Sequence, residues 1–393
     1  MWKSLFYEII LINMGKKKYK VAIIGCGSMS SNHVYGYLTT DKFNIVAISD
    51  PHVKAMLEFD SIFAHMKNYS PKHFTDPLEM LDYSDYDVIS IGTWHKLHSK
   101  WTIEAARHSP RVILCEKPMA DSLKTAKEMI KSCEENNVSL IIGHQRRFLP
   151  SFIEAKDLIS NGEIGKIELI KSDSAMGLFN WSTHHFDMFR FLLNDVECDW
   201  VMGSIERSSN RFEREIKIED KAIGTFGFQN GTVAILLSDL TTNFYQGCMI
   251  YGSEGVIDLR TGYLRLFNGK TLGKWELRRI DGTYESLLDS DFEIKEASVR
   301  QVKEIYELLC GKIKIHRNHY INGYKALEMA SAVYESTRLH EMIKLPLKTL
   351  DYPLDLLVDS GHVVPKTNEP YDIRNFLLRD KKGVRDFKLK RFD

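Results

Sequence analysis

The sequence predicts an α/β protein with two domains, in which a doubly wound domain precedes a domain built on a mostly antiparallel sheet. Short apolar runs alternate with helical patterns up to about residue 148, and a glycine-rich turn follows the first of these runs. After Pro150 the pattern changes to strands joined by short turns. A chain of 393 residues is long enough for two domains, because single hydrophobic cores rarely grow beyond ~250–300 residues.

The predicted organisation has four parts. Residues 1–18 form an N-terminal extension, 19–148 the dinucleotide-binding domain, 149–349 the second domain, and 350–393 a charged C-terminal arm. A helix expected at 323–341 could pack back on the first domain.

Charge and cysteine usage limit the classes of partner. Lys plus Arg and Asp plus Glu number 53 each, which gives no electrostatic case for nucleic acid or an anionic membrane as the main partner. The apolar stretch at residues 2–12 is about half the length of a membrane span and lacks a small-residue cleavage site. The six cysteines are dispersed without a CxxC pair, so no metal site is predicted and a reducing cytoplasm is expected.

The first domain is predicted from five apolar runs that suit strands buried on both faces of a parallel sheet. A helix with an apolar stripe is expected between the last two runs, from about Ser122 to Glu135, with Asp121 or Ser122 as its N-terminal cap. This arrangement is typical of βαβ units. The five runs are Val21–Ile24, Ile45–Ile48, Val88–Ile91, Val112–Cys115 and Leu140–Ile142.

The second domain is predicted from strand-like segments and a hairpin signal. Asn230-Gly231 separates two apolar runs, and this dipeptide favours a tight β-turn. Helices are expected at about 152–160, 183–194, 294–310 and 323–341. The expected strands are Lys166–Ser174, Ala222–Phe228, Val233–Ser238, Cys248–Tyr251 and Tyr263–Phe267.

The glycine turn runs from Gly25 to Ser30 directly after the first strand, in the pattern G-x-G-x-x-S. Gly25 permits the tight turn and Gly27 lets a pyrophosphate approach the backbone, while the following helix offers its first amides to the phosphates. Ser30 replaces the usual third glycine or alanine and is still small enough for close packing. The predicted cofactor-binding residues of this turn are Gly25, Cys26, Gly27, Ser28, Met29 and Ser30.

Asp50 ends the second strand, where an acidic residue binds the ribose hydroxyls and repels a 2′-phosphate. It therefore favours NAD as the cofactor. His52 and Lys54 lie nearby, so NADP stays an open alternative, and Asp50-Pro51 could instead be a simple turn.

A third motif, Cys115-Glu116-Lys117-Pro118, ends the fourth apolar run. A lysine at the carboxyl end of a strand in an α/β sheet lies where such folds bind their ligands. Taken alone, the same residues could form an exposed turn. Pro118 disfavours helical geometry at Lys117 and so directs its side chain.

The combined motifs resemble the Gfo/Idh/MocA family, the relatives of glucose–fructose oxidoreductase and inositol dehydrogenase. The resemblance covers about residues 19–347. It rests on the glycine turn with His33, Thr93–His98, Cys115–Pro118, Gly143–Phe148, Gly162–Ile167, and the late segments Gly323–Leu327, Tyr334–Ser336 and Leu345–Pro346.

This resemblance implies a Rossmann domain and a second α/β domain whose large open sheet makes homo-oligomer contacts, as a dimer or tetramer. It implies NAD(P)-dependent oxidation or reduction of a sugar, cyclitol or related polyol. Two alternatives stay open, an NAD-dependent glycosidase that works by transient oxidation and elimination, and a non-catalytic dinucleotide-binding sensor.

The resemblance also implies roles for single residues. Lys117 would contact the substrate and the nicotinamide ribose, with Glu116 beside it at the cofactor. Arg147 would contact the substrate. The remaining residues that match the family's cofactor loop are Thr93, Trp94 and His98.

The second catalytic element departs from the family pattern, which places an Asp four residues before a His. Here Asn180 stands four residues before His184, and Asp187 follows three residues later. On one helix the three would share a face. His184 is predicted to exchange the substrate proton, because an imidazole titrates near neutral pH. Asn180 could orient this group but supplies no charge, and Asp187 is predicted to bind substrate.

Simpler alternatives exist for this segment. Asn180 or Ser182 could cap a helix, and His184 or His185 could be packing residues. Asp187 could instead pair with Arg190 on the surface of the helix.

Overall fold

The first domain is a six-stranded parallel sheet covered by helices. The computed structural model describes residues 18–241, 247–279, 290–367 and 369–374. The strand order is β3-β2-β1-β4-β5-β6, and every neighbouring pair is parallel. The elements are β1 (Tyr19–Ile24), α2 (Ser28–Thr40), β2 (Phe43–Ser49), α3 (Val53–Phe63), β3 (Tyr69–Phe74), α4 (Pro77–Tyr83), β4 (Val88–Ile91), the 3₁₀ turn η1 (His95–Leu97), α5 (His98–Arg107), β5 (Val112–Cys115), α6 (Leu123–Glu135) and β6 (Ser139–Ile142).

The five predicted strands of this sheet are confirmed, and one strand was missed. β4 and β5 are buried along their whole length, as continuous apolar runs in a parallel sheet should be. The missed strand, β3, reads YSPKHF and lies at the edge of the sheet. Its Pro, Lys and His residues suit an edge, where one side lacks a strand neighbour, but they hide the strand from an apolar-run criterion.

The second domain is built on a nine-stranded mixed sheet with the order β16-β15-β14-β13-β7-β12-β11-β8-β17. Its pairs are antiparallel except β7 with β12. Gly231 adopts φ +86° in the turn between β11 and β12, which confirms the hairpin. The strands are β7 (Ile167–Ser174), β8 (Cys198–Glu206), β11 (Lys221–Phe228), β12 (Val233–Ser238), β13 (Gly247–Gly252), β14 (Gly255–Arg260), β15 (Tyr263–Asn268), β16 (Glu276–Arg279) and β17 (Ile343–Lys344).

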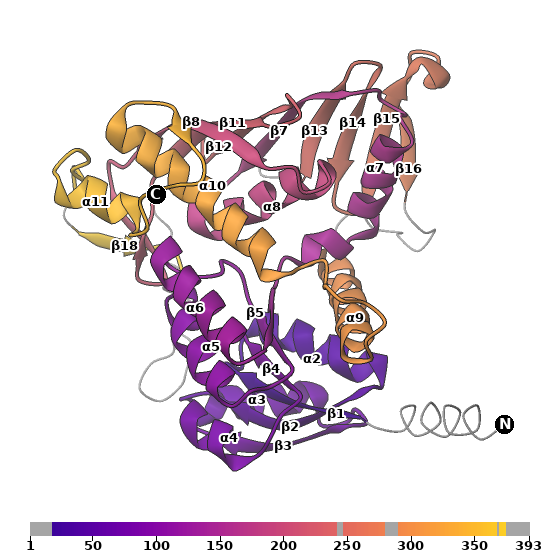
Figure 1. Ribbon diagram of the computed structural model, residues 1–393, viewed down its shortest axis with the longest axis vertical. Coiled ribbons are helices and arrows are strands. Elements are labelled where there is room, and N and C mark those ends of the chain that lie inside the picture. The colour runs from indigo at the N-terminus through magenta and orange to yellow at the C-terminus, as the bar shows by residue number, and fades with distance from the viewer. Residues whose placement is uncertain (1–17, 242–246, 280–289, 368, 375–393) are drawn as a thin grey trace.

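Helices of the second domain lie between this sheet and the first domain. Figure 1 shows α7, α8 and α10 on the side of the sheet that faces the Rossmann domain. The helices and turns are the 3₁₀ turn η2 (Gln145–Phe148), α7 (Pro150–Ser160), a π-helical turn η3 (Gly177–Trp181), α8 (Ser182–Leu192), the 3₁₀ turn η4 (Gly269–Thr271), α9 (Ser290–Leu309) and α10 (Tyr320–Leu339).

Two glycines let these late helices return to the first domain. A Cβ on Gly36 of α2 would lie 2.8 Å from the Ser298 carbonyl oxygen of α9. A Cβ on Gly323 of α10 would lie 2.7 Å from the Ile142 side chain of β6. Such distances are too short for any other residue, so both helices pack tightly against the Rossmann domain.

The chain after residue 350 adds ordered structure beside the site. It contains α11 (Pro353–Asp359) and β18 (Pro370–Asp372). The latter joins β9 (Asn210–Glu213) and β10 (Ile216–Lys217) in a three-stranded sheet of order β10-β9-β18. The predicted extension lies outside the described residues except for Lys18, as do residues 375–393 of the arm. In the part of the chain that is described, no helix has the length and apolar character needed to cross a membrane.

Candidate active site

The glycine turn connects β1 to α2 and crosses the end of β4. Gly25 has φ +91°, and a Cβ there would lie 3.0 Å from backbone atoms of Gly92 and Thr93. Only glycine fits both constraints. Gly27 is the N-terminal cap of α2 and offers no side chain to its first amides. These amides can therefore bind the phosphates of a dinucleotide.

The other residues of the turn differ in what they offer. Cys26 is buried, whereas Ser28 is exposed and Met29 is half-buried in the first turn of α2. Ser30 is buried, and its hydroxyl packs where a side chain at Gly92 would otherwise stand. The small third residue thus keeps α2 close to β4, as the sequence predicts.

Asp50 lies directly after β2 and faces the glycine turn. Its Oδ2 accepts a hydrogen bond from the Cys26 amide at 3.0 Å, and its Oδ1 accepts one from the His52 amide at 2.9 Å. A carboxylate in this place can receive the adenosine ribose hydroxyls. The glycine crossing, the uncapped helix and this carboxylate together fit NAD.

Glu116 anchors the lysine turn to the first domain. His33 Nε2 lies 2.9 Å from its Oε1, and the Lys117 amide donates to its Oε2 at 3.2 Å. Burial acts to raise the pKa of Glu116, but the hydrogen bond from His33 and the charges of His33 and Lys117 outweigh burial and lower it. The Glu116 side chain therefore holds α2 and the turn together, and the predicted cofactor contact of Glu116 stays a prediction.

Lys117 reaches from the end of β5 across to the second domain. Its Nζ donates to Asn180 Oδ1 at 2.8 Å and lies 3.4 Å from the Asn180 carbonyl oxygen. It also lies 5.9 Å from the centre of the Trp181 ring. Burial lowers the pKa of Lys117 to about 8, assisted by the charges of Arg214 and Arg146 and opposed by those of Glu116 and Glu213. Its ammonium can thus exchange a proton near neutral pH.

Asn180 bridges Lys117 to a buried carboxylate. Its Nδ2 donates to Glu213 Oε1 at 3.1 Å, and Glu213 Oε2 lies 2.9 Å from His95 Nε2. The amide orientation is determined by chemistry, since an ammonium only donates and a carboxylate only accepts. An Asp here would place two carboxylates in contact. The departure from the family pattern is therefore accommodated by Glu213, which supplies the negative charge one contact further from Lys117.

The π-helical turn places Asn180 just before α8. Its side chain caps no helix, because no side chain caps α8. Its carbonyl oxygen accepts the Thr183 hydroxyl at 2.8 Å. Short π-helical segments occur frequently at functional sites, and this one turns the amide of Asn180 toward Lys117.

His184 contributes a neutral imidazole to the same region. Its ring centre lies 5.7 Å from that of His144 and 6.4 Å from that of Trp181. Its Nδ1 is enclosed and has no hydrogen-bond partner among the described residues. Burial, and then the charges of Arg146 and Lys117, lower the pKa of His184 well below its usual value. An imidazole in this state can accept a proton throughout the neutral range.

The loop at residues 93–98 is held against the lysine turn. Thr93 and Trp94 are half-buried, while His98 is buried. His98 Nδ1 lies 2.8 Å from the Pro118 carbonyl oxygen, and Nε2 lies 3.1 Å from that of Thr93. Burial lowers the pKa of His98 to about 4. The ring is thus neutral, and it positions the turn while Thr93 and Trp94 stay predicted cofactor contacts.

Arg147 and Asp187 bind each other. Arg147 Nε donates to both carboxylate oxygens of Asp187 at 2.9 Å, and Nη1 and Nη2 donate to Asp195 at 3.0 and 2.7 Å. Both members are almost fully buried. The substrate contacts predicted for both residues stay predictions. The pairing excludes the alternative of Asp187 paired with Arg190, which lies near Glu197 instead.

Comparison with known proteins agrees with this geometry. Residues 19–144 match the profile "Oxidoreductase family, NAD-binding Rossmann fold", and residues 170–258 match the "GFO/IDH/MocA C-terminal domain". The chain belongs to the Gfo/Idh/MocA family. Members of the family that resemble it include a 1,5-anhydro-D-fructose reductase of Ensifer adhaerens, 26% identical over 68% of this chain and 82% of the relative.

Two further Gfo/Idh/MocA proteins extend the comparison. Myo-inositol 2-dehydrogenase of Thermotoga maritima is 24% identical over 61% of this chain and 74% of the relative. The structure of levoglucosan dehydrogenase with NADH and levoglucosan superimposes with a TM-score of 0.72 at 19% identity, covering 84% of this chain and 100% of that one. This last likeness shows the shared fold, and the family assignment makes the chain an NAD-binding oxidoreductase.

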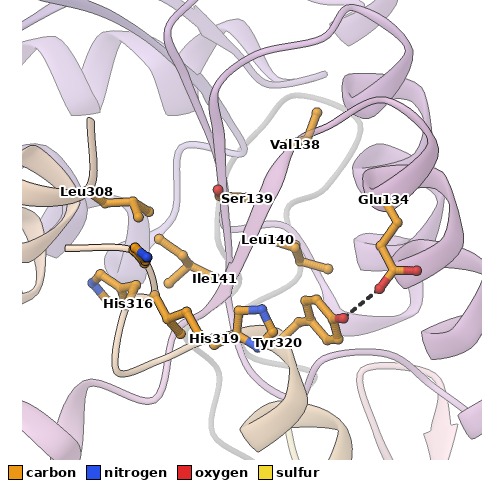
Figure 2. A pocket seen from close by; sticks show the side chains of 11 residues that line it. Glu134, Val138, Ser139, Leu140, Ile141, Leu308, His316, His319 and Tyr320 are labelled. Carbon is orange, nitrogen blue, oxygen red and sulfur yellow. Dashed lines mark hydrogen bonds between the residues drawn. The ribbon is translucent and has the colours of Figure 1, made fainter. Parts of the chain in front are cut away.

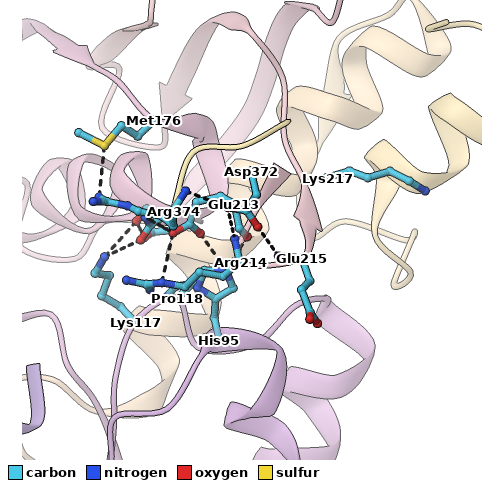
Figure 3. Close-up of polar contacts among 12 residues, drawn as sticks. His95, Lys117, Pro118, Met176, Glu213, Arg214, Glu215, Lys217, Asp372 and Arg374 are labelled. Carbon is cyan, nitrogen blue, oxygen red and sulfur yellow. Dashed lines mark hydrogen bonds and ion pairs between the residues drawn. The ribbon is translucent and has the colours of Figure 1, made fainter. Parts of the chain in front are cut away.

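Several residues of the site were missed from the sequence. Figure 3 shows Lys117, His95, Arg214 and Arg374 gathered around the carboxylate of Glu213. Glu213, Arg214 and Arg374 stand in no family motif. His144 and Arg146 lie inside the motif Gly143–Phe148, so this motif could have been used to predict that they lie near the site. Trp181 lies next to the predicted Asn180.

A separate cavity lies away from these residues. It has a volume of about 240 Å³ and lies between α6, β6 and the start of α10, where Tyr320 donates to Glu134 at 2.6 Å (Figure 2). None of the predicted site residues lines it. Within the described residues, no cluster of His, Cys, Asp and Glu could hold a metal ion.

Proposed function

We propose that this protein oxidises or reduces a secondary alcohol of a sugar, cyclitol or related polyol, with Lys117 and His184 as its catalytic residues. The observation that carries the proposal is the junction of two domains at one lysine. Lys117 follows β5, which is separated from β1 and its glycine turn by β4 alone, and its ammonium binds Asn180 one turn before His184. A dinucleotide site and a proton-exchanging pair thereby meet.

Each residue has a distinct role in alcohol oxidation. The ammonium of Lys117 donates a hydrogen bond to the substrate hydroxyl oxygen and stabilises negative charge on it. The neutral imidazole of His184 accepts the hydroxyl proton. Asn180 and Glu213 hold Lys117 in place. When bound, NAD would accept hydride from the carbon that bears this hydroxyl group, and NADH would return hydride to that carbon in the reverse reaction. In reduction His184 returns the proton to the carbonyl oxygen.

The substrate class is supported by the relatives and by the side chains present. The named relatives act on anhydrofructose, on myo-inositol and, in the structural match, on levoglucosan. Each of these is a ring with several hydroxyl groups. Lys117, Asn180 and His184 offer donors and acceptors for such a ring.

We also propose that the protein is cytoplasmic. We propose in addition that it forms a homo-oligomer through the open face of the nine-stranded sheet. Apolar side chains of β8 and β11 are exposed there, with Met202 at 59% and Ile223 at 42%. Exposed apolar patches often mark interfaces. The six cysteines are free thiols, which suits a reducing compartment. Sedimentation of a Met202→Lys variant tests the interface, and unchanged association would contradict it.

The experiment is a turnover assay of the purified protein with NAD and a panel of sugars and cyclitols, following NADH absorbance. We expect NADH to form with at least one polyol. Replacing Lys117 by Met or His184 by Ala should each reduce kcat/KM by about 10²–10⁴, the usual range for a lost acid–base group. Full activity of both variants would exclude these roles.

Two other outcomes would point to the alternative functions. Release of a sugar from a glycoside without net NADH would indicate hydrolysis by transient oxidation. Tight NAD binding with no turnover on any polyol would indicate a sensor.

A further inference from the structure

Glu219 is a buried carboxyl group that has no role in the proposed reaction. It lies between β10 and β11 and is fully buried. Its Oε1 accepts the Leu178 amide at 2.8 Å, and its Oε2 accepts the Tyr334 hydroxyl. Leu178 belongs to η3, the π-helical turn that carries Asn180. Glu219 therefore connects α10 to the turn whose amide binds Lys117.

The burial of Glu219 is compensated by these hydrogen bonds. Burial raises the pKa of Glu219, whereas the hydrogen bonds from Tyr334 and Leu178 and the charge of Arg211 act in the opposite direction. Arg211 contacts the backbone, since its Nη1 donates to the carbonyl oxygen of Glu219 at 3.1 Å. A buried carboxyl group costs free energy unless it is hydrogen-bonded. Both bonds of this side chain are made to the π-helical turn or to its anchor on α10.

Two tyrosines hold the same turn from the other side. Tyr334 is fully buried on α10, and Tyr352 directly precedes α11. The Tyr352 hydroxyl donates to the Lys217 carbonyl oxygen at 2.8 Å and lies 3.4 Å from the Tyr334 hydroxyl. Phe179 of η3 packs against both rings, with centre-to-centre distances of 4.5 Å to Tyr352 and 5.9 Å to Tyr334. The tyrosines thus fix the side chain that immediately precedes Asn180.

The start of the turn is anchored as well. The Asp239 carboxylate accepts the amides of Met176 and Gly177 at 3.2 and 3.4 Å. Met176 has a positive φ of 59°, which is unfavourable for a residue other than glycine and is often found near functional sites. A Cβ on Gly177 would lie 3.2 Å from the Ile218 side chain, the neighbour of Glu219. Three successive residues of this segment are therefore held by Asp239 and Glu219.

We infer that Glu219 is a positioning residue that sets the contact between Asn180 and Lys117. The inference rests on the proposed function and adds a residue that acts on its site through the π-helical turn. A shift of this turn would separate Asn180 Oδ1 from Lys117 Nζ, which now lie 2.8 Å apart. It would also move His184, because α8 continues directly from η3. Misplacement of a reacting group by about 1 Å can lower a rate by about 10²-fold.

Turnover of Glu219→Leu is the first test. We expect kcat to fall by about 10- to 100-fold at a temperature well below unfolding, with the NAD affinity of the wild type, because the glycine turn lies in the other domain. Glu219→Gln should recover most of kcat, since its amide oxygen can accept the Leu178 amide and its NH₂ group can donate to the Tyr334 hydroxyl. Tyr334→Phe removes only the anchoring hydroxyl and should cause a smaller fall. Wild-type kcat in both Glu219→Leu and Tyr334→Phe would overturn the inference.

Glu328→Leu is the matched control. Glu328 lies on α10, is also fully buried, and accepts the Leu347 amide at 3.0 Å. Its replacement should lower stability and leave kcat unchanged. An equal fall of kcat in Glu328→Leu and Glu219→Leu would show a general loss of packing and overturn the inference.

A double-mutant cycle with Asn180→Ala tests whether Glu219 acts through Asn180. If it does, the double variant should have about the kcat of the slower single variant, because residues that act as a unit are strongly non-additive. Losses of kcat that multiply in the double variant would show independent effects and contradict the inference.

Fluorine NMR of protein that contains 5-fluorotryptophan reports on the turn without turnover. Trp181 ends η3, and its resonance is assigned with Trp181→Phe. In the wild type it should titrate near pH 8, because Lys117 Nζ lies 5.9 Å from the ring centre and has a pKa lowered to about 8. Glu219→Leu should shift or broaden this resonance, and Glu328→Leu should preserve it. Failure of every polyol in the turnover assay would count against the proposed function alone, whereas a Trp181 resonance unchanged in Glu219→Leu would overturn the inference.

Discussion

At the scale of single residues, the chemistry of Lys117 depends on the neighbour that replaces a carboxylate. Asn180 binds the ammonium at 2.8 Å without adding charge, so burial can lower the pKa of Lys117 to about 8. Glu213 limits this effect from one contact further away. The site thus combines a lysine that titrates near neutral pH with a histidine that is neutral there.

The lowered pKa values of Lys117 and His184 predict the pH dependence of kcat/KM. Below about pH 8 Lys117 is protonated and can stabilise the substrate oxygen, so kcat/KM should fall as pH rises through this value. His184 should cause no fall in kcat/KM around the usual pKa of a histidine, because burial lowers the pKa of His184 well below that value. The profile of the free enzyme reports both groups.

Glu213→Gln provides the test of this assignment. A carboxylate near an ammonium favours its charged form, so removing that charge should move the alkaline decline to lower pH. Glu215→Gln is the control, because that exposed carboxylate pairs with Lys96 instead. An alkaline decline that stays in place in Glu213→Gln would show that Lys117 does not set it.

At the scale of elements, the glycine turn is the feature most open to a direct test. Gly25→Ala requires φ +91° and places a Cβ 3.0 Å from the backbone after β4. We expect the free energy of unfolding to fall by about 1–3 kcal/mol and NAD affinity to fall at least about 10-fold, since the phosphate contacts depend on the turn. Urea denaturation and NADH fluorescence measure the two effects.

Gly162→Ala separates strain from position. Gly162 also has a positive φ of 75°, but a Cβ there meets nothing within 4 Å. The Gly162→Ala variant should lose some stability and keep the NAD affinity of the wild type. Equal loss of NAD affinity in both variants would mean that the turn has no special role.

The ion pair between Arg147 of η2 and Asp187 of α8 provides a second prediction at this scale. Asp187→Asn removes a buried partner of Arg147, so the free energy of unfolding should fall by about 3 kcal/mol. KM should change by less than about threefold, because the pair is structural. Asp195→Asn should lower the free energy of unfolding by less than Asp187→Asn does, since the Asp195 side chain is 37% exposed. A large rise in KM without loss of stability would instead support the substrate role predicted from the sequence.

At the scale of the whole molecule, local motifs were sufficient to predict the fold class and the glycine turn, while the catalytic roles of Lys117 and His184 stay predictions. Each depends on residues adjacent in sequence. Glu213 and Arg374 could not be predicted, because their positions depend on the pairing of β9 with β18, strands far apart in the chain. The edge strand β3 was missed because its polar residues suit a surface that only the complete sheet defines.

The site depends on the entire fold, because its residues come from both domains and from the C-terminal segment. The first domain supplies the dinucleotide turn and Lys117, and the second supplies Asn180, His184 and Glu213. The C-terminal segment adds Asp372 and Arg374, beyond both family matches. Close packing of α9 and α10 on the Rossmann domain holds these parts together.

The most direct test of the account is a single turnover with a polyol deuterated at the carbon that is oxidised. The wild type should transfer deuterium to NAD, and Lys117→Met should bind NAD normally but transfer at least about 10²-fold more slowly. Rapid mixing with detection of NADH absorbance and mass measures both. Transfer by Lys117→Met at the wild-type rate would contradict the central role of this lysine.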